Sequence, residues 1–325
     1  MSIQGDGKPG GNFIPGYEQF LDEVLEGLRK EQKELPTKYL YDKNGSQLFE
    51  RICLLDEYYV PDVEDQIVRS NITEITDLLG PKVLLIEFGS GSCQKIRFLL
   101  DHLDSPAGYV PIDISEEQLM RVTAELTGDY PELELLPVCG DYTGNFEIPP
   151  ISGDYHRKIV YFPGSTIGNF TPSQAILFLK DIKSLFGNNG GLLIGFDLKK
   201  DLGILNSAYN DNKGVTAAFN LNLLHRLNRE LGSNFRVELF DHYAFYNQEE
   251  GRIEMHLVSS QDQSVKLNGE TIDFKQGETI WTESSYKYTT EEFRKIAILS
   301  GLSVNRVWTD DDEWFGVMYL ESADL

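Results

Sequence analysis

Glycine and acidic residues follow the ends of three predicted strands, in positions where they could bind a cofactor that contains ribose and adenine. Gly89 and Gly91 come directly after the apolar run 83–87, and Asp113 ends the next apolar run. Glycines let a backbone approach a ligand closely, and a carboxylate at the second strand end can hold ribose hydroxyls. Asp141 and Tyr142, one helix and strand later, suit the adenine edge. The predicted cofactor-binding residues are Gly89, Gly91, Lys95, Asp113, Asp141 and Tyr142.

The first loop favours S-adenosylmethionine over a dinucleotide. A dinucleotide loop has a third small residue three positions after its second glycine, where the helix packs closely on the strand. Gln94 occupies that position here. An oxidoreductase on a dinucleotide fold is therefore the weaker alternative, and an ordinary strand–turn–helix without a ligand stays open.

The elements that must position these residues alternate between strand and helix from residue 82 to about 198. Predicted strands lie at 83–87, 108–113, 133–138, 158–162 and 191–196. Such alternation predicts a parallel sheet with helices on both faces. A capping box at 289–292 begins a helix that ends at Gly301, and strands at 304–309 and 314–320 follow. A helix and an antiparallel hairpin are the typical ending of a class I methyltransferase sheet.

Residues 201–286 interrupt this alternation. A helical piece at 214–231 precedes β-rich runs at 243–247, 252–259 and 278–283. We predict an α/β protein, a class I methyltransferase Rossmann-like sheet with an inserted α+β substrate-binding lobe. The lobe would comprise residues 1–60 plus 201–286, and the cofactor-binding domain residues 61–200 plus 287–325. Two further helices are predicted, over 16–34 and from beyond Val63 to about Leu79.

The charge of the chain favours a small-molecule substrate. Its 52 acidic residues outnumber 29 basic ones, which gives a net charge of −23. Such a surface repels nucleic acids and anionic membranes, although solubility alone would explain it equally well. No signal peptide or membrane-length apolar run is present, and neither the three cysteines nor the five histidines have the spacing of metal ligands. We expect a cytoplasmic monomer without a metal, a membrane or a nucleic-acid partner.

Longer strings of residues are similar to those of one known family, from about residue 36 to 320. They are Lys38-Tyr-Leu-Tyr-Asp-Lys-Asn-Gly-Ser-Gln-Leu-Phe49, Glu57-Tyr-Tyr59, Glu87-Phe-Gly-Ser-Gly91, Gly164-Ser-Thr-Ile-Gly-Asn169, Gly214-Val-Thr-Ala-Ala-Phe-Asn220, Ile253-Glu-Met255 and Thr282-Glu-Ser-Ser285. The chain thus resembles the histidine-specific, S-adenosylmethionine-dependent α-N-methyltransferases of ergothioneine biosynthesis.

The resemblance implies an enzyme that transfers three methyl groups, one after another, to the α-amino group of L-histidine. The products would be N,N,N-trimethylhistidine (hercynine) and S-adenosylhomocysteine. Relatives in this fold family accept tryptophan-derived substrates. Methylation of another aromatic amino acid or a small amine therefore stays open, as does a non-catalytic protein that binds the cofactor.

The resemblance also implies which residues bind the amino and carboxylate groups of histidine. Gly164 and Asn169 follow the fourth predicted strand, at the edge where ligands bind in open α/β sheets. Around them the resemblance places Phe49, Tyr41, Tyr58 and Tyr209. Tyr41 is the candidate catalytic residue, either as proton acceptor or as the group that orients the amine.

The remaining implied substrate residues would recognise the imidazole ring. Glu283 and Ser285 are two apart on one predicted strand and therefore share a face, where a carboxylate and a hydroxyl could hold the two ring nitrogens. Met255 would supply an adaptable apolar wall. One departure from the family is Pro163-Gly164-Ser165, where actinobacterial members would have Gly-Gly-Thr, and it concerns the shape of this loop and not the reaction.

Overall fold

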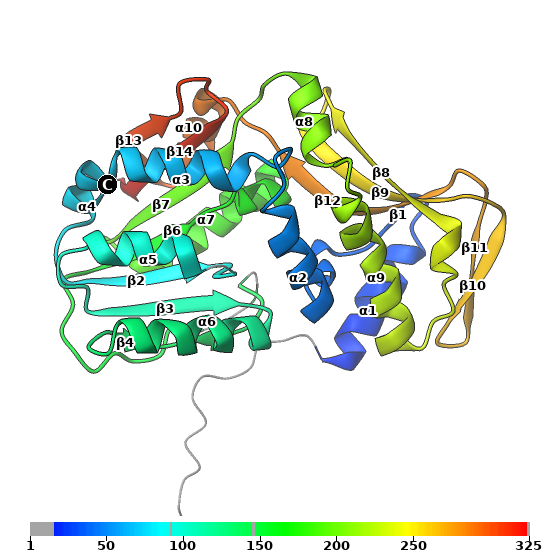
Figure 1. Ribbon diagram of the computed structural model, residues 1–325, viewed down its shortest axis with the longest axis horizontal. Coiled ribbons are helices and arrows are strands. Elements are labelled where there is room, and N and C mark those ends of the chain that lie inside the picture. Colours follow the sequence, from blue (N-terminus) through cyan, green and yellow to red (C-terminus); the bar gives the residue numbers. More distant parts are fainter. Residues whose placement is uncertain (1–15, 92, 143, 145–146, 324–325) are drawn as a thin grey trace, which may run out of the picture.

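A central sheet of eight strands dominates the computed structural model, which describes residues 16–91, 93–142, 144 and 147–323. Its strand order is β13-β14-β7-β6-β2-β3-β4, with β5 also paired to β3 (Figure 1). The strands are β2 (Val83–Phe88), β3 (Gly108–Asp113), β4 (Glu134–Leu135), β5 (Val138–Cys139), β6 (Arg157–Phe162), β7 (Gly191–Asp197), β13 (Leu302–Thr309) and β14 (Phe315–Ser322). Only the pairings of β14, with β7 and with β13, are antiparallel. This arrangement confirms the predicted Rossmann-like sheet and its terminal hairpin.

Helices cover both faces of this sheet, because successive residues of its buried strands point to opposite sides. Leu85 of β2 belongs to a core that includes Ile96 of α5. The neighbouring Leu84 and Ile86 belong to a second core, with Leu179 of α7. The helices around the sheet are α3 (Val60–Ser70), α4 (Ile72–Leu79), α5 (Cys93–His102), α6 (Glu116–Asp129), α7 (Pro172–Phe186) and α10 (Thr290–Leu299).

A smaller sheet, ordered β1-β12-β9-β8, forms beside the central one (Figure 1). It contains β8 (Phe240–Asn247), β9 (Arg252–Ser259), β12 (Thr279–Tyr286) and the N-terminal β1 (Lys33–Glu34). With it lie α1 (Tyr17–Leu28), the short 3-10 helices η1 (Thr37–Leu40) and η3 (Val237–Leu239), α2 (Lys43–Ile52), α8 (Leu202–Ala208), α9 (Val215–Leu231), and the hairpin of β10 (Gln263–Leu267) and β11 (Glu270–Phe274). The segment before the central sheet therefore joins the inserted one, since β1 pairs with β12.

Three predicted elements differ from the structure by more than a shift of up to three residues at their ends. The first helix ends at Leu28 instead of residue 34, because Lys33 and Glu34 pair with β12. The helix predicted up to Leu79 is two helices, α3 and α4, which meet at Asn71. The strand predicted at 133–138 is split into β4 and β5, on either side of a segment that contains Pro137, which has no backbone N–H to donate.

The inserted segment contains five strands where three β-rich runs were predicted. The additional pair, β10 and β11, is joined by Asn268 and Gly269, both with positive φ. Asn-Gly is the preferred pair for a two-residue hairpin turn, so the sequence carried a signal for this hairpin. Within the described residues, no helix is long and apolar enough to cross a membrane.

Candidate active site

The loop after β2 lies at the point where the strand order of the central sheet reverses, since β3 and β6 flank β2 on opposite sides. Gly89 has a φ of 74°, which favours glycine, and its backbone N–H donates to the carbonyl oxygen of Ile112 at 2.9 Å. A Cβ added at Gly89 would meet no heavy atom within 4 Å. Ligands in open α/β sheets bind at such a reversal, beyond the carboxyl ends of the strands. The loop is therefore a site where a ligand could approach the backbone.

Asp113, at the end of β3, lies beside this loop. Its Oδ1 accepts a hydrogen bond from the backbone N–H of Ser115 at 2.8 Å. Burial raises the pKa of Asp113 to about 6, against the lowering effect of its backbone hydrogen bonds. The carboxylate is therefore ionised at neutral pH and can accept hydrogen bonds from hydroxyl groups.

The next strand end also reaches this edge. The backbone N–H of Gly140 donates to the carbonyl oxygen of Asp113 at 2.9 Å, and Asp141 forms an ion pair with Lys38 at 3.3 Å. The ring of Tyr142 lies 5.5 Å from that of Phe88, centroid to centroid. The structure thus brings Gly89, Gly91, Asp113, Asp141 and Tyr142 to one edge of the sheet, and their role in binding stays a prediction.

The sixth predicted cofactor residue, Lys95, contacts a side chain that sequence reasoning missed. Its Nζ lies 2.6 Å from Oε2 of Glu64, whose side chain is only 1% exposed. The Glu64 carboxylate also accepts from the backbone N–H of Gly164 at 3.0 and 3.1 Å. Glu64 thereby connects α5, which follows the cofactor loop, to the loop after β6. A signal was available, since Glu64 lies on the buried stripe of α3 with Ile67 and Val68.

Five of the predicted substrate residues line one small cavity between α2, α9 and the smaller sheet. The lining consists of Phe49, Ile52, Tyr58, Ala208, Tyr209, Thr216, Phe219, Met255 and Glu283. The cavity has a volume of about 20 Å³, which is room for about one water molecule. The cavity must therefore widen to admit an amino acid.

Tyr41 lies next to this cavity, with its ring centroid 5.5 Å from those of Phe49 and Phe219. Burial, reinforced by Glu283, raises the pKa of Tyr41 well above its ordinary value. The phenol therefore keeps its proton at neutral pH, so Tyr41 is better suited to orient a group than to accept a proton as a phenolate. The carbonyl oxygen of the preceding residue, Leu40, packs closely on α2, where a Cβ on Gly45 would lie 1.7 Å from it.

Glu283 is the buried carboxylate of the cavity, on β12 opposite Met255 of β9. It is 9% exposed, and its Oε2 has no hydrogen-bond partner among the residues that the structure describes. Burial raises the pKa of Glu283 to about 7, although Lys287 lowers it. The strand register shifts between Trp281 and Glu283, which allows the consecutive side chains of Thr282 and Glu283 both to be buried.

Ser285 belongs to a buried hydrogen-bond network behind the cavity. Its Oγ accepts from Tyr209 Oη at 2.9 Å and from Lys287 Nζ at 2.8 Å. Lys287 also forms an ion pair with Asp197 at 2.7 Å, and both of these side chains are fully buried. Tyr209, placed by the resemblance with the amino and carboxylate groups, thus contacts the residue placed at the ring. Lys287 and Asp197 were missed, although Asp197 is, like Asp113, an acidic residue at the end of a strand.

The loop that carries Gly164 and Asn169 packs against the same network. It contains the short helix η2 (Thr166–Asn169), and a Cβ on Gly168 would lie 3.3 Å from Ser285 Oγ. Ser165 Oγ accepts from the backbone N–H of Asp197 at 2.9 Å. Both predicted groups of substrate residues are therefore supported by one buried cluster.

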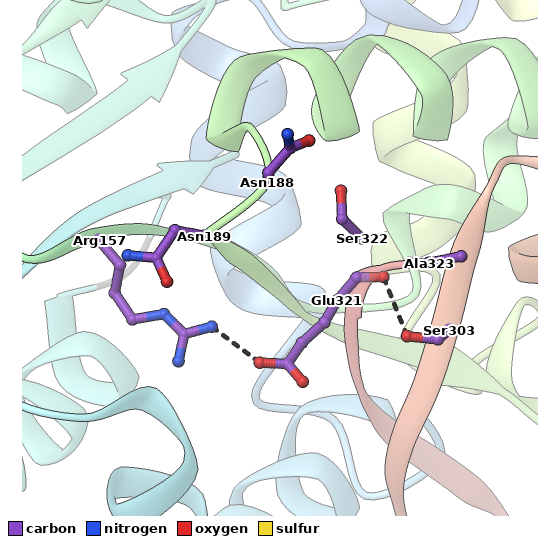
Figure 2. Close-up of a pocket in the computed structure, with 7 residues that line it drawn as sticks. All are labelled: Arg157, Asn188, Asn189, Ser303, Glu321, Ser322 and Ala323. Carbon is purple, nitrogen blue, oxygen red and sulfur yellow. Dashed lines mark hydrogen bonds and ion pairs between the residues drawn. The ribbon is translucent and has the colours of Figure 1, made fainter. Parts of the chain in front are cut away.

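A second, larger cavity of about 490 Å³ lies at the opposite edge of the sheet (Figure 2). Arg157 at the start of β6 and Glu321 near the end of β14 line it and form an ion pair of 2.8 Å. The carboxyl ends of the parallel strands, with the glycine loop, are at the other edge. This polar cavity is therefore separate from the candidate site.

Comparisons with known proteins agree with the geometry. A model of the family described as "Histidine-specific methyltransferase, SAM-dependent" matches residues 20–322. The chain is 38% identical over 300 residues to the histidine N-alpha-methyltransferase of Mycolicibacterium smegmatis, which covers 91% of this chain and 92% of that protein. It is 33% identical over 290 residues to ergothioneine biosynthesis protein 1 of Neurospora crassa, covering 87% of this chain and 32% of that protein. A 4-dimethylallyltryptophan N-methyltransferase of Claviceps purpurea is 24% identical over 316 residues, 89% of this chain and 91% of that protein.

Proposed function

The chain belongs to the family of S-adenosylmethionine-dependent, histidine-specific methyltransferases, and from this premise we propose that it transfers three methyl groups to the α-amino group of L-histidine. The product is then N,N,N-trimethylhistidine (hercynine), and the reaction is a step of ergothioneine biosynthesis. The similarity to a histidine N-alpha-methyltransferase and to ergothioneine biosynthesis protein 1 supports this proposal.

The buried carboxylate of Glu283 is the observation that best supports histidine as the substrate. A buried carboxylate oxygen without a partner is costly, unless a ligand donates a hydrogen bond to it. The ring N–H of an imidazole can make that bond, and Met255 packs beside the position it would take. In the proposed complex, the second ring nitrogen faces the hydroxyls of Ser285, two residues along β12 from Glu283, and of Tyr209, which bonds to Ser285.

The residues at the sheet edge fit S-adenosylmethionine. Gly89 leaves room for a close approach, Asp113 offers an ionised carboxylate for ribose hydroxyls, and Tyr142 offers a ring face near the end of β2. When bound, the cofactor would supply a methyl group on a sulfonium, and the sulfur would leave as the neutral thioether of S-adenosylhomocysteine. The protein must hold the neutral form of the amine with its nitrogen lone pair in line with that methyl group.

The aromatic lining suits an amine that gains bulk in three steps. Each methylation removes an N–H donor, so a fixed carboxylate clamp on the amine would lose its partner. Phe49, Tyr58 and Phe219 are neutral and present ring faces and edges, which can contact the growing methylammonium group through cation–π attraction. The protonated Tyr41 hydroxyl orients the amine from beside the cavity.

Mass spectrometry of the reaction products tests this proposal. The protein is incubated with S-adenosylmethionine and an equimolar mixture of L-histidine, L-tryptophan and L-tyrosine. We expect histidine to gain one, two and finally three methyl groups, while the other two amino acids remain unmodified. Faster methylation of another aromatic amino acid would favour the alternative substrate class, and an end point at monomethylhistidine would contradict trimethylation.

A further inference from the structure

The ammonium group of Lys287 donates hydrogen bonds to three acceptors of the protein. Its side chain is fully buried and its Nζ contacts Asp197 Oδ2 at 2.7 Å, Ser285 Oγ at 2.8 Å and Tyr209 Oη at 3.1 Å. An ammonium has three donors and no acceptor. Burial lowers the pKa of Lys287, but Asp197 outweighs it, so the pKa lies above its ordinary value. Each hydroxyl therefore accepts a hydrogen bond from a group that cannot accept one in return.

This arrangement leaves a donor on the two hydroxyls. The bond between Tyr209 Oη and Ser285 Oγ, 2.9 Å long, uses one hydroxyl proton. The other hydroxyl proton has no protein acceptor among the described residues, whichever of the two oxygens carries it. Tyr209 lines the cavity, so this proton is available to a ligand there when Ser285 donates to Tyr209 and the Tyr209 hydroxyl donates into the cavity. Ser285 and Tyr209 are thus the donor end of the cavity, and the unpartnered Glu283 oxygen is its acceptor end.

We propose that Lys287 is a positioning residue that makes the enzyme bind histidine with a neutral imidazole ring. The ring nitrogen that carries a proton faces Glu283, and the nitrogen without a proton faces the Ser285–Tyr209 donor. This inference rests on the proposed function, because it assumes that the histidine ring occupies this cavity. An imidazolium carries two N–H groups, so one of them would meet a donor, close to the ammonium of Lys287.

The charged groups around the donor end are Asp197, Lys287, Lys200 and Glu283. Lys200 contacts the other Asp197 oxygen at 2.5 Å and donates to Tyr59 Oη at 2.6 Å, but it contacts neither Ser285 nor Tyr209. Burial lowers the pKa of Lys200 to about 8, against the raising effect of Asp197. Lys200 therefore keeps its charge below neutral pH and provides a matched control for Lys287.

Two pyrrolylalanines test the direction of these hydrogen bonds. The 2-pyrrolyl and 3-pyrrolyl isomers each keep an N–H at one nitrogen position of histidine and have C–H at the other, so both lack the bare nitrogen. Calorimetry with S-adenosylhomocysteine present measures each dissociation constant. In the wild-type protein, histidine should bind about 10- to 100-fold tighter than the better isomer, because the analogue leaves a buried donor unpaired.

Lys287→Met should reduce this preference by at least about fivefold, since the hydroxyls can then turn oxygen atoms toward the ring. Lys200→Met should keep the wild-type preference within about twofold, because it removes a buried ammonium without touching the hydroxyls. The amino and carboxylate groups are common to all ligands and cancel in the ratio. An unchanged preference in Lys287→Met would overturn the role of Lys287.

The wild-type protein alone provides a second test, which decides the matter if Lys287→Met does not fold. Between pH 7.5 and 5.5 the neutral fraction of imidazole falls about tenfold, whereas pyrrole does not titrate. Protonation of Glu283 affects both ligands, so the preference for histidine should itself fall about tenfold. A constant or rising preference would show that imidazolium is accepted and overturn the proposal. Failure of histidine to bind better than tryptophan at pH 7.5 would instead overturn the proposed function.

Discussion

At the scale of single residues, two carboxylates with raised pKa values serve different predicted tasks. Asp113 is half-buried at the cofactor edge, and burial raises its pKa to about 6. Glu283 is enclosed by the aromatic cavity, and burial raises its pKa to about 7 in spite of Lys287. Both are ionised at mildly alkaline pH, when each can accept a hydrogen bond from a ligand.

Replacing Glu283 by Ala should lower kcat/KM for histidine by about 30- to 1000-fold, which corresponds to about 2–4 kcal/mol. The physical reason is the loss of a charged acceptor for the ring N–H in a desolvated cavity. Steady-state kinetics on histidine measures this effect. The dissociation constant of S-adenosylhomocysteine is the internal control and should stay near the wild-type value, because Glu283 is on β12, outside the cofactor edge.

A smaller residue at Met255, combined with Glu283→Ala, should also make room for a larger aromatic amino acid such as tryptophan, since both side chains line the cavity. If Glu283→Ala alone keeps wild-type turnover, the imidazole is recognised elsewhere. The proposal would then reduce to an amino acid N-methyltransferase of undefined side-chain preference.

Replacing Asp113 by Ala should raise the dissociation constant of S-adenosylhomocysteine about tenfold or more. Two ribose hydroxyls lose an ionised acceptor, and hydrogen bonds to charged groups contribute roughly 1.5–3 kcal/mol. Calorimetry measures the affinity, and circular dichroism checks that the fold is intact. Unchanged affinity in a folded variant would remove Asp113 from the cofactor site.

The same carboxylate predicts how cofactor affinity depends on pH. Because the pKa of Asp113 is about 6, protonation below that pH removes the charged acceptor. Affinity should therefore be constant above about pH 7 and fall as pH decreases through 6. Calorimetry from pH 7.5 to 5 should show this decline in the wild-type protein and a much flatter profile in Asp113→Asn, and matching profiles would assign the titration to another group.

At the scale of secondary-structure elements, Glu64 of α3 joins segments that lie on both sides of the candidate site. Its carboxylate binds Lys95 of α5 and the backbone of Gly164 after β6. A Cβ at Gly195 of β7 would lie 2.0 Å from Glu64 Oε1, so a side chain at this position would displace the carboxylate. The helix after the cofactor loop and the η2 loop are thus joined by one buried carboxyl group.

Glu64→Gln should lower the free energy of unfolding by about 1–3 kcal/mol, because the amide leaves Lys95 without its ion-pair partner and weakens acceptance from Gly164. Chemical denaturation measures this change. Asp62→Asn on the same helix is the matched control: Asp62 is exposed, and its replacement should change stability by no more than about 0.5 kcal/mol. Equal effects of the two variants would show that Glu64 makes no special contribution.

At the scale of the whole molecule, the cavity is lined by segments that are far apart in the sequence. Some precede the parallel strands of the central sheet along the chain, and others follow them. Phe49 comes from α2, Tyr209 follows α8, and Glu283 lies on β12. The η2 loop, which follows β6 of the central sheet, packs against β12. Because the cavity has room for about one water molecule, binding of an amino acid requires movement among these segments.

We predict that histidine binds about fivefold tighter or more when S-adenosylhomocysteine is present. If both ligands favour the same closed arrangement of the smaller sheet on the central one, each ligand reduces the conformational cost for the other. Calorimetry with and without S-adenosylhomocysteine measures the factor. Thermodynamic linkage requires histidine to tighten S-adenosylhomocysteine binding equally, and equal histidine affinities in the two titrations would indicate a rigid, preformed site.

The sequence alone predicted those features of the fold that depend on local patterns of residues. Apolar runs that alternate with helical periods specify the central sheet, since buried parallel strands need continuous apolar residues. The glycines after β2 and the acidic strand ends at Asp113 and Asp141 follow from that sheet, because its topology brings carboxyl ends together. The resemblance then supplied the substrate residues, five of which the structure gathers around one cavity.

Tertiary structure decided what depends on contacts between distant residues. No local pattern shows that Lys33 and Glu34 leave the first helix to pair with a strand almost 250 residues later, because sequence separation does not limit strand pairing. Likewise, the ion-pair partners of Glu64, Asp197 and Lys287 follow only from the packing of several elements around each charge. From sequence alone, a charged side chain is predicted to be exposed, because burying a charge is unfavourable. Only partners that the fold brings close to the charge compensate for its desolvation.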